Sequence, residues 1–465
     1  MISRVLAEWA ADSNDLLNED ASNATKRAFV DVVACAVAGS MDPSTRSIVR
    51  LCRGFGSGAA LGLGVIERRP APWAALIGGT AAHALDFDDN FAPATTHATA
   101  VLAPALFALA DELRCDGQRI ATAYIVGLEV QARIGRLLNP SHYEAGWHAT
   151  STVGTIGSAV ACARLLGLDP GRTLAALSAA ASMAAGSKKQ FGTSLKPVHA
   201  GLAAKNAVLA ARMAEAGIVG DVEPLTGKWG ISELYDGEVD QEAASLFAVE
   251  ALSSGLSIER DGLLQKRFPC CGAAHRTLDG LARLREAHGI RLEEVERIEA
   301  FIPSFARANL RYDDPQNETE ARFSLTYCGA RVLQNGTLDL ADLTDARVRD
   351  PEIRRLYRRF AIHTKSGSVA EELGADASPA LTRITMTDGR VLEAEISAVK
   401  GSNVDPLAEV DTRGKFTSCC EWAGAGDVAD ELYALSGRIL EHDDHTIFSN
   451  ELEHLLRENA GPFRG

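Results

Sequence analysis

The sequence predicts a mainly α-helical protein with a smaller α+β domain. Apolar residues recur at three- and four-residue intervals through most of the first half of the chain, which is the spacing of one helix face. Strand patterns are confined to residues 294–398, with helical stretches between them, and helical spacing returns after Lys400. We therefore expect a large helical bundle that is discontinuous in sequence, residues 1–262 and 400–465, and a small α+β domain, residues 263–399.

The large domain is expected to consist of helices separated by Gly, Pro or Asp. The first segment, MISRVLAEWAADSND, is interrupted by Arg4, Glu8 and Asp12, so it predicts an amphipathic helix rather than the apolar core of a signal peptide. No apolar stretch predicts a membrane span, and we expect a cytoplasmic protein with no membrane partner. Later helices are expected near residues 22–39, 71–86, 98–113, 118–137, 148–167, 170–186, 197–216, 425–440 and 448–457.

The small domain is expected to combine strands with helices. The segment EVERIEAFI, residues 294–302, mixes β-branched and charged residues in near alternation and predicts a strand. The segment LTRITMTDGRVLEAEISA, residues 381–398, contains two alternating runs joined by Asp388-Gly389, which predicts a β-hairpin. Helices are expected near residues 272–288, 319–335 and 350–359.

Composition excludes several classes of function. The chain has 465 residues, with 62 acidic against 47 basic side chains and a net charge of -15. Because it contains no block rich in Lys and Arg, we expect no nucleic-acid partner, whereas a small anionic substrate needs only a local cluster of cations. The nine cysteines form no CxxC pair and no zinc-finger spacing, so we expect reduced, mostly structural thiols and no iron–sulfur cluster.

The segment LDFDDNFAPATTHAT, residues 85–99, brings carboxylates, an amide and an imidazole together. Asp86, Asp89 and Asn90 stand at helical offsets and are expected to share one helix face, after which a proline ends the helix and His97 follows in a loop. One alternative is a set of solvated carboxylates. Another is the aspartate-rich magnesium motif of helical isoprenoid synthases, but the chain has no second acidic cluster at the spacing that this motif requires.

Two histidines and a lysine are predicted at helix N-termini. In AGWHATSTVGTIGSA, His148 opens a helix of small residues that leaves room for a ligand, unless it is a structural cap. In GTSLKPVHAGLAAKN, Pro197 fits a first helical turn that includes His199, so Lys196 stands at the positive end of the helix dipole. A cation is unfavourable there without an anion, which is either a substrate carboxylate or a neighbouring Asp or Glu.

The small domain holds further candidates. The segment LLQKRFPCCGAAH places Lys266 and Arg267 just before a Phe-Pro pair, with His275 following. Basic residues at a domain junction either face a cleft or form a solvated surface patch.

A tyrosine in NETEARFSLTYCGA is another candidate. Tyr327 is expected on the same helical side as Glu320 and Ser324. It either donates a proton or binds a carboxylate, or it is a packed tyrosine of the core.

Four motifs, taken together and in this order, resemble the MmgE/PrpD family: LDFDDNFAPATTH, GWHATSTVGTIGSA, GTSLKPVHAGLAAKNAVLAA, and KRFPCC followed by EARFSLTYCGA. Members include 2-methylcitrate dehydratase, cis-aconitate decarboxylase and iminodisuccinate epimerase, which act on small polycarboxylates without a metal or organic cofactor. The resemblance implies an all-helical domain built from both chain ends, a smaller α+β domain, a homodimer, and no cofactor.

The resemblance also implies that the site is lined by Asp86, His97, His148, Lys196, Lys266 and Tyr327. Three positions depart from the family pattern. Asn90 stands where many members have Thr, ATTHAT replaces the usual His-Pro at His97, and Cys271 falls where some decarboxylase-type members have His. These departures argue against transferring cis-aconitate decarboxylation to this chain.

The chemistry implied by this resemblance is removal of a proton alpha to a carboxylate, which needs a base and fixed positive charge. We expect Lys196 to hold the carboxylate, and His148 and His97 to act as base and acid. Asp86 would orient an imidazole, and Tyr327 would protonate a leaving hydroxyl or bind a second carboxylate. The expected substrate-binding residues are Asn90, His199, Lys266, Arg267 and His275.

Three functions remain, in this order. The first is a cofactor-independent hydro-lyase acting on a small hydroxy-polycarboxylate, like 2-methylcitrate dehydratase. The second is an epimerase or isomerase of a related dicarboxylate, like iminodisuccinate epimerase. The third is a catalytically silent helical interaction protein.

Overall fold

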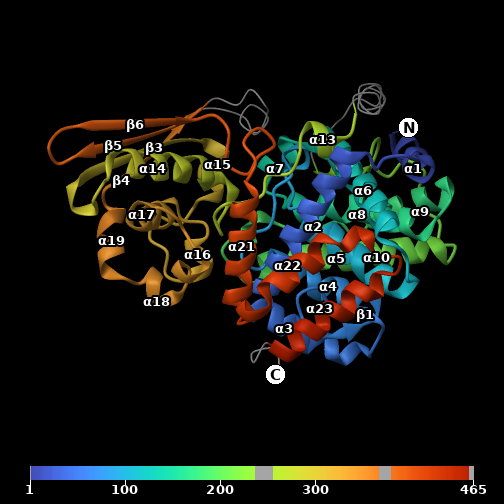
Figure 1. Cartoon of the computed structure of the whole chain (residues 1–465). Coiled ribbons are helices and arrows are strands. Elements are labelled where there is room, and N and C mark those ends of the chain that lie inside the picture. The colour runs from blue at the N-terminus through green and yellow to red at the C-terminus, as the bar shows by residue number, and fades with distance from the viewer. Residues whose placement is uncertain (1, 236–254, 366–378, 460–465) are drawn as a thin grey trace. The chain divides into compact units, whose positions relative to one another are not determined.

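The computed structural model describes residues 2–235, 255–365 and 379–459, and it divides into two compact units (Figure 1). The first unit comprises Met1–Lys189, Leu195–Leu263 and Glu409–Gly465 and is helical; the second comprises Gln190–Ser194 and Leu264–Ala408 and contains a four-stranded sheet. The prediction of a mainly α protein with a smaller α+β part is confirmed.

The helical unit contains the helices predicted in the first half and two that the sequence pattern did not indicate. Its longer helices are α1 (Ile2–Asp12), α2 (Glu19–Gly39), α3 (Pro43–Cys52), α4 (Ala71–His83), α5 (Thr99–Leu113), α6 (Gly117–Leu138), α8 (Ala149–Leu166), α9 (Pro170–Ala181), α10 (Leu195–Glu215), α21 (Glu409–Trp422), α22 (Ala429–Gly437) and α23 (His445–Asn459). Helices α3 and α21 were not expected. Three short helices, α7 (Ser141–Glu144), α11 (Ile231–Tyr235) and α13 (Ser257–Arg260), and an antiparallel pair, β1 (Ala60–Leu61) and β2 (Arg68–Arg69), complete it.

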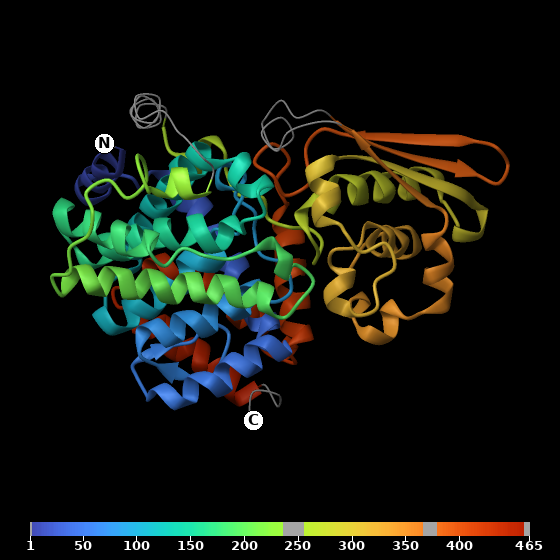
Figure 2. The same cartoon turned by 180° about the vertical axis from the view of Figure 1, so that it is seen from behind.

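Helices α4, α5, α8 and α10 form the centre of this unit. Residues 99–111 of α5 are all buried, and so are residues 149–163 of α8, which explains why both are apolar or small on every side. Helix α10, the long green helix in Figure 2, packs against α4 and α8. It comes very close to α4, since a Cβ on Gly201 would lie 2.3 Å from the carbonyl oxygen of Leu76.

The C-terminal helices pack on helices from the first part of the chain. Helices α21 and α22 pack against α2, and α23 packs against α5. Asp111 of α5 accepts hydrogen bonds from the Ser449 hydroxyl at 2.6 Å and from the Leu61 backbone N–H at 2.8 Å. These contacts hold the two ends of the chain in one helical unit.

The second unit is a mixed sheet with helices. The strand order is β4 (Phe360–Lys365), β3 (Val295–Pro303), β5 (Ala380–Met386) and β6 (Val391–Ile396), with β3 and β4 parallel and the other pairs antiparallel. The predicted strand and the predicted hairpin are confirmed, whereas β4 was not expected. The helices are α14 (His275–His288), α15 (Ser304–Asn309), α16 (Glu318–Ala321), α17 (Leu325–Asn335), α18 (Asp345–Val348) and α19 (Pro351–Tyr357), of which α14 packs on β5 and β6.

The helix expected over residues 319–335 is two helices, α16 and α17. Ser324 has an extended backbone, φ -119° and ψ 108°, and its side chain accepts a hydrogen bond from the Tyr327 backbone N–H, so it caps α17. The prediction that Glu320, Ser324 and Tyr327 share one helical side is therefore wrong, because the cap changes the direction of the chain between them.

All nine cysteines are buried, and no disulfide joins any of them. Across the part of the chain that the structure describes, no helix is both long enough and apolar enough to cross a bilayer.

Candidate active site

The loop between α4 and α5 carries the first predicted cluster. Helix α4 ends at His83, and Asp86 has φ 53°, in the left-handed region that aspartate tolerates better than most residues. The prediction that Asp86, Asp89 and Asn90 share a helix face is therefore wrong, because the helix stops before them. The three carboxylates of the loop, Asp86, Asp88 and Asp89, are each at most 3% exposed, which also excludes the solvated alternative.

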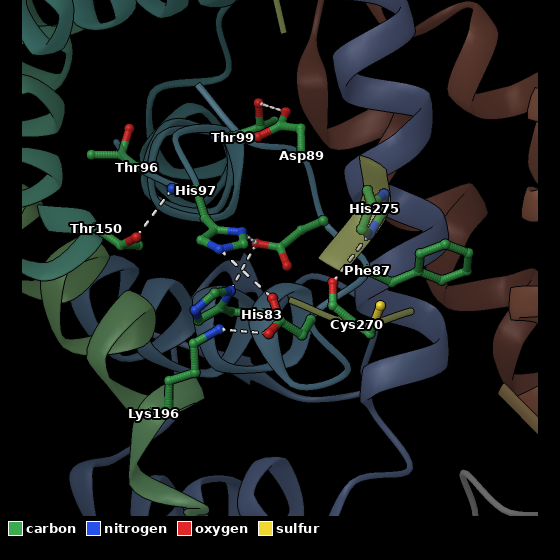
Figure 3. Close-up of polar contacts among 12 residues, drawn as sticks. His83, Phe87, Asp89, Thr96, His97, Thr99, Thr150, Lys196, Cys270 and His275 are labelled. Carbon is green, nitrogen blue, oxygen red and sulfur yellow. Dashed lines mark hydrogen bonds and ion pairs between the residues drawn. The ribbon is translucent and has the colours of Figure 1, made fainter. Parts of the chain in front are cut away.

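His97 lies in this loop, as predicted, and faces its carboxylates (Figure 3). Its Nδ1 is 3.1 Å from Oδ2 of Asp88, and its Nε2 is 3.7 Å from Oδ1 of Asp86. The backbone N–H of His97 donates to Oγ1 of Thr150 on α8 at 3.0 Å, which ties the loop to that helix. The carboxylates thus hold the imidazole from two directions.

A second imidazole, His83, was not predicted as a site residue. Its Nδ1 is 2.8 Å from Oδ2 of Asp88, and its ring lies 4.4 Å from that of His97. Burial lowers the pKa of His83 to about 4, with Asp88 opposing the shift. Burial alone would raise the pKa of Asp88, but the two imidazoles hold it well below its usual value, so Asp88 is ionised and His83 is neutral near pH 7.

Lys196 occupies the predicted position at the start of α10. It is the second residue of that helix, and His199 follows in the first turn, as expected. Its Nζ is 3.1 Å from Oδ2 of Asp86, and both side chains are at most 5% exposed. The anion beside Lys196 is thus the neighbouring aspartate that was the alternative to a substrate carboxylate.

His148 precedes the first turn of α8, as predicted, and its side chain does not cap the helix. Its Nδ1 lies 3.1 Å from Nδ1 of His199, so these two imidazoles share one hydrogen bond. Burial and then the charge of Lys196 lower the pKa of His148 well below its usual value, while burial lowers that of His199 to about 4. Both histidines are therefore neutral near pH 7 and can accept protons.

Asp89 and Asn90 have different surroundings from Asp86. Asp89 accepts hydrogen bonds from the backbone N–H of Thr99 at 3.3 Å and from its hydroxyl, which also contacts the Tyr124 hydroxyl at 2.6 Å (Figure 3). Burial raises the pKa of Asp89 to about 7 despite the Thr99 hydrogen bonds. The side-chain oxygen of Asn90 is buried without a hydrogen-bond partner in the described residues, so its predicted substrate contact stays a prediction.

A lysine of the unexpected helix α21 supports the same loop. Nζ of Lys415 lies 2.7 Å from Oδ1 of Asp31 on α2 and donates to the carbonyl oxygen of Phe87 at 2.8 Å. Burial alone would lower the pKa of Lys415, but Asp31 raises it above its usual value, so the lysine is charged. The C-terminal part of the chain therefore fixes the backbone between Asp86 and Asp88.

One group in the described residues has a spacing compatible with a metal ion. Ligand atoms of His83, Asp88 and His97 all lie within 4.8 Å of one another, and two imidazoles with a carboxylate are a common ligand set. Imidazole and carboxylate already partner each other here, and the charge of Lys196 already lowers the pKa of His83. A divalent cation would add a second positive charge to these surroundings, so the set fits a cation poorly.

The remaining candidates lie in the second unit and are described within it. Lys266 is fully buried, which excludes the solvated-patch alternative for this residue, whereas Arg267 is partly exposed and pairs with Asp279 at 3.4 Å. His275 is the first residue of α14, buried, with Nε2 3.4 Å from the carbonyl oxygen of Cys270.

Tyr327 is buried in the core of the second unit. Its hydroxyl donates to the carbonyl oxygen of Asp342 and accepts from Nε of Arg331 at 3.2 Å. Burial raises its pKa to about 12. These contacts are those of the packed tyrosine named as the alternative, and the catalytic role of Tyr327 stays a prediction.

Comparison with known families gives two matches in chain order. The profile of the MmgE/PrpD N-terminal domain matches residues 4–243, and that of the MmgE/PrpD C-terminal domain matches residues 268–434. The chain belongs to the MmgE/PrpD family. The resemblance drawn from the four motifs is confirmed.

Curated relatives of this MmgE/PrpD protein are cis-aconitate decarboxylases. The human enzyme is 27% identical over 402 residues, covering 83% of this chain and 80% of the relative. The mouse enzyme is 28% identical over 397 residues, with 83% and 79% covered. The Aspergillus terreus enzyme is 24% identical over 457 residues, with 92% and 90% covered. Family membership and these similarities support lyase activity.

Sequence reasoning missed three residues of the site, His83, Asp88 and Lys415. His83 had a usable signal, because it is the one ionisable side chain of α4, whose other residues are almost all apolar or small. Asp88 was taken for a solvated residue, since its helical offset was misjudged. Lys415 had no local signal, because its partners lie more than 300 residues away.

Proposed function

We propose that this MmgE/PrpD protein is a cofactor-independent hydro-lyase that acts on a small hydroxy-polycarboxylate. The observation that carries the proposal is one buried cluster in which neutral imidazoles lie beside the Lys196–Asp86 ion pair. A base takes the proton alpha to a carboxylate, the electron pair of that C–H bond forms the alkene, and the β-hydroxyl leaves with a proton from an acid as water.

Lys196 supplies the positive charge that this reaction needs. Charge develops on the substrate carboxylate as the α-proton leaves, and a buried ammonium at a helix N-terminus stabilises it in place. Asp86 holds Lys196 and contacts His97, so it orients both. The proposal keeps His148 and His97 as the groups that exchange protons with the substrate.

Decarboxylation is the second candidate, favoured by the names of the curated relatives. In that reaction the bond to a carboxyl carbon breaks, CO2 leaves, and the remaining carbanion takes a proton. The same cluster offers a charge for the carboxylate and imidazoles for the proton transfer. The departures at Asn90, His97 and Cys271 place this candidate second.

Proton NMR in D2O tests the two candidates. The protein is incubated, with a chelator present, with citrate, 2-methylcitrate, cis-aconitate and iminodisuccinate in turn. A new alkene with no loss of carbon supports the hydro-lyase, whereas an alkene together with CO2 supports the decarboxylase. Deuterium entering the alpha position of unconverted substrate or its epimer, without an alkene, would replace both by the epimerase.

The variant Lys196→Ala tests the site itself. We expect its rate to fall on the order of a hundredfold or more, as for the loss of one group that stabilises developing charge. Lys205→Ala is the matched control, because Lys205 lies on the same helix, over the ring of Trp73 at 5.5 Å. A fall of less than about fivefold in Lys196→Ala would remove this lysine from the mechanism.

A further inference from the structure

His83 has no role in the mechanism above, although it lies in the middle of the cluster. It is the last residue of α4 and is 1% exposed. Its ring lies 4.4 Å from the ring of His97 and is stacked on that of His148, with centroids 5.8 Å apart and planes 24° apart. The imidazole is therefore held in one orientation by packing.

The hydrogen bond to Asp88 determines where the proton of His83 lies. Asp88 is ionised and can only accept, so Nδ1 of His83 carries the hydrogen and donates it to Oδ2 at 2.8 Å. Because burial keeps the imidazole neutral, Nε2 must then carry a lone pair. The pair has the arrangement of a carboxylate that fixes the tautomer of a general base.

The lone pair on Nε2 has no hydrogen-bond partner among the residues that the structure describes, although the atom is buried. An unsatisfied buried polar atom costs about 1–3 kcal/mol, and such atoms are rare in folded proteins. The Nδ1 atoms of His148 and His199 instead face each other at 3.1 Å. His83 thus presents an acceptor atom that protein contacts leave unused.

We propose that His83, oriented by Asp88, is the base that takes the α-proton of the substrate at Nε2. The inference rests on the proposed function and makes it more specific, since it replaces His148 in this role. The C–H bond breaks, its electron pair forms the alkene, and Nε2 binds the proton while Nδ1 keeps its own. Asp88 stabilises the imidazolium that results, and the proton later passes to solvent.

The variant His83→Asn separates this role from a structural one. The asparagine amide can still donate to Asp88 from a position near that of Nδ1, but no atom replaces Nε2. We expect kcat, and the rate of deuterium entry at the α-position, to fall by about a hundredfold or more. We expect KM to change by less than about threefold and Tm to stay near that of the wild type.

His142→Gln is the matched control. His142 is also fully buried in the helical unit, and its Nε2 contacts Oγ1 of Thr152 at 3.0 Å, a contact that the glutamine amide can replace. We expect it to keep most of the wild-type rate.

The pH profile gives a second readout. The charged groups around His83 are Asp88, His97, Lys196, His148 and His199. Protonation of a base with a pKa of about 4 lowers kcat/KM on the acid side, and this limb should disappear in His83→Asn. Nitrogen NMR of the wild type gives a third readout that needs no variant, because it shows directly which nitrogen of His83 carries hydrogen.

The outcomes separate this inference from the proposed function. An active wild type whose His83→Asn variant loses less than about fivefold in rate overturns the role of His83 and leaves the hydro-lyase intact. An unprotonated Nδ1 in the wild type overturns it as well. Loss of wild-type activity on removal of a bound metal would make His83 a ligand instead of a base. A wild type that converts none of the substrates overturns the hydro-lyase and this role together.

Discussion

His445, the first residue of α23, shows how burial alone sets the charge of a side chain. It is fully buried between the rings of Phe107 and Phe448, with centroids 4.9 and 5.3 Å away. Neither ring nitrogen has a hydrogen-bond partner among the described residues. Burial lowers its pKa to about 3, so it is neutral in the folded protein at any mildly acidic pH.

This histidine should make the protein sensitive to acid. The unfolded chain binds the proton near pH 6.5 and the folded chain only near pH 3, so stability is lost as the pH falls from about 6.5 towards 3. Between pH 7.5 and 5, urea titrations of His445→Leu should lose about 2 kcal/mol less of the free energy of unfolding than the wild type. His454→Leu, exposed on the same helix, should behave like the wild type. Equal losses in all three proteins would contradict the assignment.

Lys415 shows that one buried cation can support a loop from a distant part of the chain. Replacing it by Met leaves the Asp31 carboxylate buried without its lysine and removes the donor to the Phe87 carbonyl oxygen. The free energy of unfolding should therefore fall by about 3–5 kcal/mol in urea titrations. Arg413→Met is the control on the same helix, because its ion pair with Asp430 is exposed and should contribute less than about 1 kcal/mol. Similar losses in the two variants would mean that the Lys415 pair contributes no more than a surface pair.

At the scale of elements, the approach of α4 and α10 brings His83 and Lys196 into one cluster. Each helix contributes a glycine to the crossing: a Cβ on Gly79 would lie 2.9 Å from Cα of Gly201, and one on Gly201 would lie 2.3 Å from the Leu76 carbonyl oxygen. Backbone atoms cannot move aside as a side chain can. The crossing therefore requires small residues at these positions.

Gly201→Ala tests this crossing. The added methyl group should force the helices apart and lower the free energy of unfolding by about 1–3 kcal/mol. Gly414→Ala is the opposite case, because Gly414 lies in α21 with nothing within 4 Å of an added Cβ, and alanine there should stabilise the helix by about 0.5–1 kcal/mol. Thermal and urea unfolding of both variants give the comparison. A neutral Gly201→Ala would show that the helices can separate without cost.

The whole molecule carries a net charge of -15, yet the candidate site presents a lysine and several histidines. An anionic substrate is therefore repelled by the average surface and attracted by one buried cation. Binding to the folded state alone raises stability by RT ln(1 + [L]/Kd), about 2.7 kcal/mol at a ligand concentration of a hundred times Kd.

Polycarboxylates should accordingly raise Tm. We expect a concentration-dependent increase with citrate or 2-methylcitrate in differential scanning calorimetry, and a much smaller one with acetate at equal ionic strength. The increase should be lost in Lys196→Ala and kept in Lys205→Ala. The absence of any increase in the wild type, or an equal one in Lys196→Ala, would contradict carboxylate binding at this lysine.

The sequence by itself determined the helices, the β-hairpin, the family, and the placement of His148 and Lys196 at helix starts. Each of these features is local: apolar spacing reports which face is buried, Pro197 and Asp388-Gly389 mark a helix start and a turn, and the family motifs are short runs of residues.

Only the tertiary structure decided which side chains meet. Lys196 and Asp86 are an ion pair, and His83 binds Asp88, because α4 ends before the aspartates and its loop turns back through a left-handed residue. Spacing alone continued the helix to residue 86 and placed these groups on the wrong face. Lys415 reaches the loop from 328 positions away, and no local pattern records such a contact, because burial and charge pairing depend on packing between segments that are distant in sequence.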